Sequence, residues 1–350
     1  MFADYEYPLA ADFIRWLGAR AEELDQQPGH AAELLQYLGQ QSLFGLGVPS
    51  SLGGVPGSSF KDAFQAVMTT ARYSLTAGFV LWAQRGVIGF LTRANNDALA
   101  ERWVPALIRG QLAGAPGLSN LIKHGGGLEP LQLKARAGAQ GWHLQGRLPW
   151  VSNVQEGKFL LIAAAQINSA QTAVFLLPHD SANLQRSPDF SLHAIQSSAT
   201  AAIECAQTPL SADLQLASCA FEFIGQVRPQ FLALQCALSL GIGMASIQQV
   251  LQRRKLPAHL AARAEQLGMG LRRISRQLLE GIESTAWEQS PQGLFQCRVQ
   301  LAELTTQSAL LAMQAEGGVC FVQGQRPDTM RRLREALLLP LITPTIAQLS

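Results

Sequence analysis

Helix-like and strand-like patterns occupy separate parts of this chain, and that segregation restricts the possible folds more than any other feature of the sequence. In the first third, apolar residues recur every three or four positions, which is the spacing of amphipathic helices. These segments cover residues 12–43, 60–73, 76–93 and 97–108. Short alternating segments separated by turn residues follow between residues 131 and 205, as in a small antiparallel β-domain. Helical spacing then returns, and the lack of alternation argues against a doubly wound parallel sheet.

The same pattern predicts an α+β fold built from three parts. We expect an N-terminal all-helical domain over residues 1–113, a small central antiparallel β-barrel-like domain over residues 114–218, and a C-terminal four-helix bundle over residues 219–350. The first boundary lies where glycine and proline residues, beginning with Gly114, interrupt the helical spacing. In the last part, long apolar stripes alternate steps of three and four residues, which is typical of bundle helices.

Charge and cysteine content limit the partners and the compartment. The formal net charge is only +2, so no electrostatic argument favours nucleic acid or an anionic membrane surface. The five cysteines are scattered without a C-x-x-C pair, which indicates reduced thiols in a cytoplasmic protein. The most apolar run, residues 231–245, is shorter than the roughly 20 residues needed to span a bilayer. The acidic first residues do not resemble a signal peptide. We therefore expect a soluble cytoplasmic protein without a membrane span.

The usual sequence signatures of catalysis are missing. The six histidines show no spacing typical of metal ligands, so no metal site is predicted. There is no Gly-x-Ser-x-Gly nucleophile elbow, no Gly-x-Gly-x-x-Gly dinucleotide loop and no obvious pair of carboxylates. Any chemistry would therefore have to come from a bound cofactor.

One stretch could form a wall for such a cofactor. Residues 141–153 alternate as a half-buried strand, and Trp150 follows Pro149 at its end, two residues before Ser152. A flat indole beside a small hydroxyl could line a slot for a planar aromatic ligand. A tryptophan in a strand is also a common core residue, so this pattern alone leaves both interpretations open.

Five strings, in order along nearly the whole chain, resemble those of one family. Trp150-Val151-Ser152-Asn153 is similar to a Trp-(Ile/Val)-(Thr/Ser)-Asn motif, and Gln314-Ala315-Glu316-Gly317-Gly318 is similar to Gln-x-x-Gly-Gly. The other three strings are Gly-x-Pro with Gly-Gly at residues 43–54, Trp-x-Pro-x-Leu-x-x-Gly at residues 103–110, and the helix start at residues 240–245. Together with the order of the domains, they resemble the acyl-CoA dehydrogenase superfamily of FAD flavoproteins.

The resemblance implies FAD as the cofactor and roles for particular residues. Trp150 would pack on the edge of the isoalloxazine ring, and Ser152 would hydrogen-bond near its reactive nitrogen. Ser119, followed by Asn120, would contact the flavin from the loop that enters the β-domain.

A second set of implied contacts would come from a neighbouring subunit, because such proteins are commonly homodimers or homotetramers with FAD at the subunit interface. Arg253 would meet the FAD diphosphate, and Gln314 with Gly317 and Gly318 would let the backbone approach the cofactor closely.

The chain departs from this family where the catalytic base is expected. Arg334-Glu335-Ala336 matches the helix that precedes the family's glutamate, and counting forward places Thr343 at the position of that glutamate. A threonine hydroxyl cannot abstract an α-proton, because its pKa is far above neutral pH. On the first bundle helix, where some members carry the base instead, the chain offers only Gln230 and Gln235.

Three functions therefore stay open. The chain could be an FAD-dependent oxidoreductase that oxidises a C–C bond of a small-molecule substrate such as an acyl-CoA. It could be an oxygen-using flavin monooxygenase of the same fold, which needs no glutamate. It could also be a non-catalytic member with a binding or assembly role. Fold alone does not distinguish them.

Overall fold

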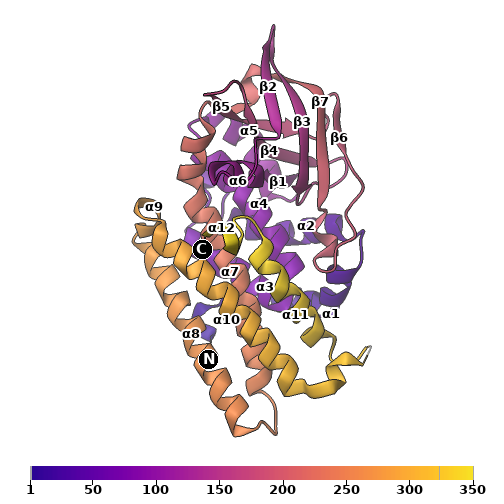
Figure 1. The fold of residues 1–350 in the computed structure, drawn as a ribbon, viewed down its shortest axis with the longest axis vertical. Helices are drawn as coiled ribbons and strands as arrows, with labels where there is room; N and C mark the ends of the chain where they lie inside the picture. Colours follow the sequence, from indigo (N-terminus) through magenta and orange to yellow (C-terminus); the bar gives the residue numbers. More distant parts are fainter. Residues whose placement is uncertain (1, 323, 350) are drawn as a thin grey trace.

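The computed structural model describes residues 2–322 and 324–349 (Figure 1). A β-sheet lies at one end of the molecule, long C-terminal helices lie at the other, and N-terminal helices pack beside and between them (Figure 1). The predicted α+β class, with helices first, a sheet in the middle and a helical bundle last, is confirmed.

The N-terminal part is all helical, as its apolar spacing predicts. Its helices are α1 (Ala11–Gln26), α2 (Ala31–Gln40), α3 (Phe60–Tyr73), α4 (Leu75–Arg93) and α5 (Asp97–Ile108), with 3₁₀ turns at Ala3–Tyr5, Leu43–Gly45 and Ser50–Leu52. Polar side chains fix where these helices begin. Ser59 and Asp62 form a capping box at α3, and the Ser74 side chain accepts a hydrogen bond from the Ala77 backbone N–H at α4.

The central part is one eight-stranded sheet. Its strands are β1 (Ala113–Gly117), β2 (Leu133–Gly138), β3 (Gly141–Val151), β4 (Phe159–Gln166), β5 (Thr172–Pro178), β6 (Leu184–Arg186), β7 (Ala201–Ser211) and β8 (Gln215–Ala217). The strand order is β6-β7-β3-β2-β4-β5-β8, and β1 pairs with β4. The sheet is mainly antiparallel, as expected, but β1 and β2 both pair with β4 in parallel.

Two elements in this region depart from the sequence-based expectation. The Ala-Gly-Ala-Pro-Gly segment of β1 has little intrinsic strand propensity. It becomes a strand through tertiary contacts, including a hydrogen bond of 2.6 Å from the Gly114 N–H to the Gln84 side chain on α4. The segment that begins at Ser119 is expected as a loop, yet it forms a short helix, α6 (Ser119–Gly125).

The C-terminal part contains α7 (Ala220–Leu251), α8 (Ala258–Glu283), α10 (Gln292–Glu316) and α11 (Pro327–Leu338), with the short elements α9 (Ala286–Gln289), η6 (Gly317–Phe321), η7 (Leu339–Leu341) and α12 (Ile346–Leu349). Helix α7 is apolar nearly all round because α3 and α4 pack on it as well as α8 and α10. Helices α4 and α7 are long and apolar enough to cross a membrane, but 89% and 94% of their most apolar windows are buried in the fold. Each is thus accounted for as a core helix.

Candidate active site

A cavity of about 660 Å³ opens between the sheet, helices α4, α6 and α7, and the segment that follows α11. Its size is within the range of ligand pockets, and most of its wall is apolar. Four residues singled out by the sequence line it together: Ser119, Trp150, Ser152 and Thr343. The predicted residues thus converge on one site although they lie on a helix, a strand and the C-terminal segment.

Trp150 presents its indole to this cavity and is not a core residue. The side chain is 56% exposed, and its ring lies 4.6 Å from that of Phe190 at an interplanar angle of 58°. In contrast, Trp142 on the same strand packs edge-on against Phe175, with ring centroids 5.5 Å apart. The interpretation of Trp150 as a core residue is therefore wrong, and its role as a wall for a planar ligand stays a prediction.

A line of hydroxyl groups follows the wall beside Trp150. The Thr200 hydroxyl donates to Ser152 Oγ at 3.1 Å and lies 2.8 Å from Ser198 Oγ. Thr200 also lines the cavity. The sequence does not predict this role, because Thr200 lies in a run of small residues without a distinctive motif. Its position depends on positive φ angles at Ile195 and Ala199, which are unusual for such residues.

Asn120 does not share the position of its neighbour Ser119. Its amide nitrogen donates to Glu129 Oε1 at 2.8 Å and to the Pro130 carbonyl at 3.0 Å, and its oxygen accepts from the Gln132 N–H at 2.9 Å. These bonds fasten the loop after α6. Ser119 reaches the cavity, whereas Asn120 is occupied within the protein.

The C-terminal wall is held in place by buried polar groups. Gln235 Nε2 donates to the Thr343 carbonyl at 2.8 Å, and Gln235 Oε1 has no hydrogen-bond partner among the described residues. The fully buried Arg298 donates to the Leu339 carbonyl, so the chain is fixed just before Thr343. Two of the three positions considered for a base, Thr343 and Gln235, therefore contact each other, whereas Gln230 accepts a hydrogen bond from Arg93, and none of the three is a carboxylate.

The charges around the cavity are cationic. Among its described lining residues the titratable side chains are Lys123, His193 and Arg334, and none is Asp or Glu. Lys123 pairs with Glu129 at 3.6 Å, and Arg334 pairs with Asp25 at 2.8 Å and with Glu22. A carboxylate base is absent from the described wall.

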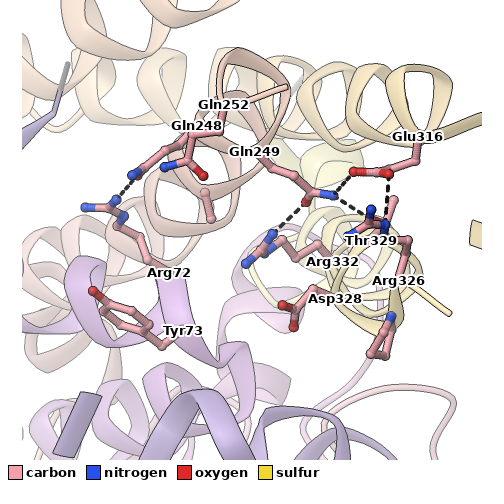
Figure 2. A pocket seen from close by; sticks show the side chains of 12 residues that line it. Arg72, Tyr73, Gln248, Gln249, Gln252, Glu316, Arg326, Asp328, Thr329 and Arg332 are labelled. Atoms are coloured by element: carbon pink, nitrogen blue, oxygen red, sulfur yellow. Dashed lines mark hydrogen bonds and ion pairs between the residues drawn. The ribbon is translucent and has the colours of Figure 1, made fainter. Parts of the chain in front are cut away.

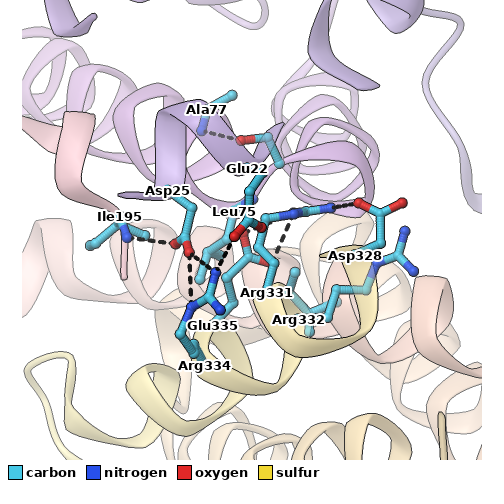
Figure 3. A network of polar contacts seen from close by, with 12 residues as sticks. Glu22, Asp25, Leu75, Ala77, Ile195, Asp328, Arg331, Arg332, Arg334 and Glu335 are labelled. Carbon is cyan, nitrogen blue, oxygen red and sulfur yellow. Dashed lines mark hydrogen bonds and ion pairs between the residues drawn. The ribbon is translucent and has the colours of Figure 1, made fainter. Parts of the chain in front are cut away.

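Behind the wall, a buried network joins α1, α4, α11 and the loop before β7 (Figure 3). Asp25 is fully buried and accepts from the Ile195 N–H at 2.8 Å as well as from Arg334. Glu335 is also fully buried; it accepts from Arg331 at 3.0 Å and from the Leu75 N–H, at the start of α4, at 3.1 Å.

The carboxylates of this network keep Arg331 in its charged form. Burial alone lowers the pKa of Arg331, but the attraction of Glu335 and Asp328 outweighs burial and raises that pKa. A buried guanidinium with two carboxylate partners therefore stabilises the packing of α11 against the N-terminal helices.

The second set of predicted residues lies elsewhere. Gln314, Gly317 and Gly318 lie at the end of α10, and Arg253 lies just after the end of α7. Glu316, the last residue of α10, lines a hollow of about 450 Å³ (Figure 2). Arg253 pairs with Glu316, and Gln314 and both glycines are exposed. None of the four lines the first cavity. Within a single chain, the two sets of predicted residues therefore lie at different places. The predicted contact of the second set with the flavin of another subunit stays a prediction.

Within the described residues, no group of three or more His, Cys, Asp or Glu side chains is arranged to hold a metal ion. All five cysteines are free thiols, and four of them are buried.

Comparison with known proteins finds a family model that matches the N-terminal helices. Residues 10–111 match the family model described as "Acyl-CoA dehydrogenase, N-terminal domain". Mitochondrial isovaleryl-CoA dehydrogenase of Pongo abelii is 26% identical over 153 residues, which is 42% of this chain and 35% of that protein. The match therefore spans about a third of the length of this curated relative.

Two solved structures show the extent of the shared fold. Butyryl-CoA dehydrogenase from Megasphaera elsdenii superposes with a TM-score of 0.87 at 17% identity, covering 99% of this chain and 95% of that one. KijD3 in complex with FMN and a dTDP-linked amino sugar superposes with a TM-score of 0.80 at 16% identity, covering 97% and 89%. The N-terminal helices thus match the acyl-CoA dehydrogenase N-terminal domain model, and the whole chain shares the fold of these two structures.

Proposed function

We propose that this chain is a flavin-dependent oxidoreductase whose flavin ring lies in the 660 Å³ cavity against Trp150. The observation that carries this proposal is the exposed indole of Trp150 beside the hydroxyls of Ser152 and Thr200. A flat apolar face next to hydroxyl groups suits a ring that is planar and has one polar edge. The family-model match of the N-terminal helices and the shared fold support the same placement of the flavin.

Each residue has a defined task in this proposal. Trp150 stacks against the ring or its edge, while Ser119, Ser152 and Thr200 offer hydrogen bonds to its polar atoms. The bound flavin would supply two-electron transfer and, once reduced, reaction with O₂. FAD is the form that the resemblance implies, and FMN carries the same ring.

Trp150→Ala is expected to weaken flavin binding by about tenfold or more, because it removes the stacking surface. The measurement is a titration of the apoprotein with flavin, followed by quenching of flavin fluorescence. Trp142→Phe is the matched control: it lies on the same strand but outside the cavity, and should bind flavin like the wild-type chain. Equal affinities of Trp150→Ala and the wild type would contradict the placement of the ring.

The reaction class follows from the carboxylate-free wall. Removing an α-proton from an acyl thioester requires a base, and Thr343 cannot serve as one. We therefore propose that the chain does not abstract an α-proton: once an external two-electron donor has reduced the flavin, one oxygen atom of O₂ would enter an apolar substrate and the other would leave as water. An acyl thioester is a reasonable substrate class, because the isovaleryl-CoA and butyryl-CoA dehydrogenases are named for acyl-CoA compounds.

One observation favours the alternative of acyl thioester dehydrogenation. His193 lines the cavity, and its imidazole has no hydrogen-bond partner among the described residues. Histidine is the side chain that most readily exchanges a proton near neutral pH, so His193 could replace the missing glutamate.

Anaerobic mixing with acyl-CoA thioesters separates the two functions. We expect the wild-type chain to keep its flavin oxidised without O₂, and to form an oxygenated product when its flavin is first reduced chemically and O₂ is then admitted. Anaerobic bleaching of the flavin in the wild type, lost in His193→Gln with flavin still bound, would instead establish the dehydrogenase.

A further inference from the structure

The resemblance assigns Arg253 to the FAD diphosphate, but in this structure Arg253 is paired with the carboxylate of Glu316. Glu316 ends α10, and its side chain is only 6% exposed. It accepts a hydrogen bond from Gln249 Nε2 at 3.1 Å, and Arg326 Nε lies 3.3 Å away (Figure 2). It also accepts a hydrogen bond from Arg253 Nη1. Two guanidinium groups thus share one internal anion.

Glu316 stays ionised at neutral pH. Burial opposes ionisation of its carboxyl group, yet the hydrogen bonds from Gln249 and Arg253, with the attraction of Arg253 and Arg326, hold the pKa below its usual range. The negative charge is therefore a permanent part of this end of the chain.

The side chain of the neighbouring Gln249 is also occupied. Gln249 Nε2 donates to Thr329 Oγ1 at 2.6 Å in addition to Glu316, and Gln249 Oε1 accepts from Arg332 Nη1 at 2.7 Å. Among the described residues, the Arg253 side chain has no other ion-pair or hydrogen-bond partner than Glu316. A diphosphate that approached Arg253 would have to displace this partner or lie beside its charge.

This arrangement does not fit the adenylyl half of FAD. A diphosphate needs uncompensated cations or N–H donors, and its binding is opposed by a like charge nearby. Glu316 offsets one of the two positive charges on Arg253 and Arg326, and its carboxylate occupies Arg253, so the pair attracts a diphosphate carried by another subunit less than two free arginines would.

We infer that the adenylyl half of FAD adds no affinity in this protein, so that FMN binds about as tightly as FAD through the ring cavity alone. The inference rests on the proposed function, since it concerns which flavin that same cavity takes. In this reading Glu316 is a specificity-determining residue, because its carboxylate fills the position of a phosphate.

The test is a titration of the apoprotein with FMN and, separately, with FAD. For the wild type, we expect the two dissociation constants to agree within about threefold, which is less than one charge-assisted hydrogen bond contributes. This comparison needs no variant, so it does not depend on whether a substituted chain folds.

Glu316→Gln then tests the assigned residue. The substitution keeps the shape of the side chain and frees Arg253 and Arg326, so FAD affinity should rise by about tenfold or more while FMN affinity is unchanged. Glu303→Gln is the matched control: it removes one charge from an exposed position on the same helix and should change neither constant. Adding Arg253→Ala to Glu316→Gln should abolish the gain.

Each result decides a different question. If the wild type binds neither flavin, the proposed function and this inference both fail. If it binds FAD at least tenfold more tightly than FMN, the inference is wrong and the proposed function stands. If Glu316→Gln behaves like Glu303→Gln, Glu316 does not control the choice of flavin and the inference is overturned.

Discussion

Replacing Arg331 with methionine is expected to lower the free energy of unfolding by about 3–5 kcal/mol, because it leaves a buried carboxylate without its cation. Arg331 is 1% exposed and Glu335 is fully buried, and the pair joins α11 to the start of α4. The measurement is urea unfolding followed by circular dichroism. The matched control is Arg15→Met, which removes an arginine from an exposed i,i+3 ion pair with Asp12 and should cost at most about 1 kcal/mol.

The pH dependence of this loss identifies its cause. Burial raises the pKa of Glu335 above 4.5 in the folded protein, even with the opposing attraction of Arg331, and without Arg331 that rise should be larger. A carboxyl group with a raised folded-state pKa contributes its stability below the unfolded-state pKa and loses it as pH rises through the folded-state pKa. The deficit of Arg331→Met should therefore be smaller at pH 5 than at pH 8. A deficit that is independent of pH would indicate lost packing rather than an unpaired charge.

Thr343→Glu is expected to raise the rate at which an acyl-CoA thioester reduces the bound flavin by about 10²–10⁴-fold over the wild type, the usual contribution of a general base. Thr343 lines the cavity, and the Gln235 side chain fixes its backbone. A carboxylate introduced into this mostly apolar wall would have a raised pKa, which strengthens it as a base near neutral pH. The measurement is the rate of anaerobic bleaching of the flavin.

Thr345→Glu is the control for position. Thr345 lines the same cavity, so the variant carries the same new charge two residues further along the chain. Bleaching by both variants would show that added charge, and not its place, is responsible. If neither variant reacts while both bind flavin, then either Thr343 does not face the reacting carbon or the cavity does not admit acyl thioesters.

The sequence predicted those features that depend on local patterns. The spacing of apolar residues predicted the first and last residues of α3 and α5, and the order of helix and strand patterns predicted the α+β class. The motif around Trp150 and Ser152 predicted two neighbours in the cavity, because both lie at the end of one strand.

Features that depend on distant contacts were not predictable in this way. The loop that carries Thr200 is tied to α1 through the Asp25 side chain and the Ile195 N–H, 170 residues apart in sequence. The αL conformations of Ile195 and Ala199 have no glycine to signal them. Likewise, the resemblance pointed to Arg253 but not to its pairing with Glu316, because the partners are 63 residues apart and on different elements.

The ion pair between Asp25 and Arg334 has a consequence for how the chain becomes structured during its synthesis. The two residues are 309 positions apart, so the α1 helix leaves the ribosome long before the α11 helix that supplies its cation. Until then Asp25 would be a buried charge without a counter-ion, which disfavours its final packing. We therefore expect the N-terminal helices to stay loosely packed until the C-terminal bundle has been synthesised. We expect the three parts of the chain to reach their final packing together, after synthesis of α11.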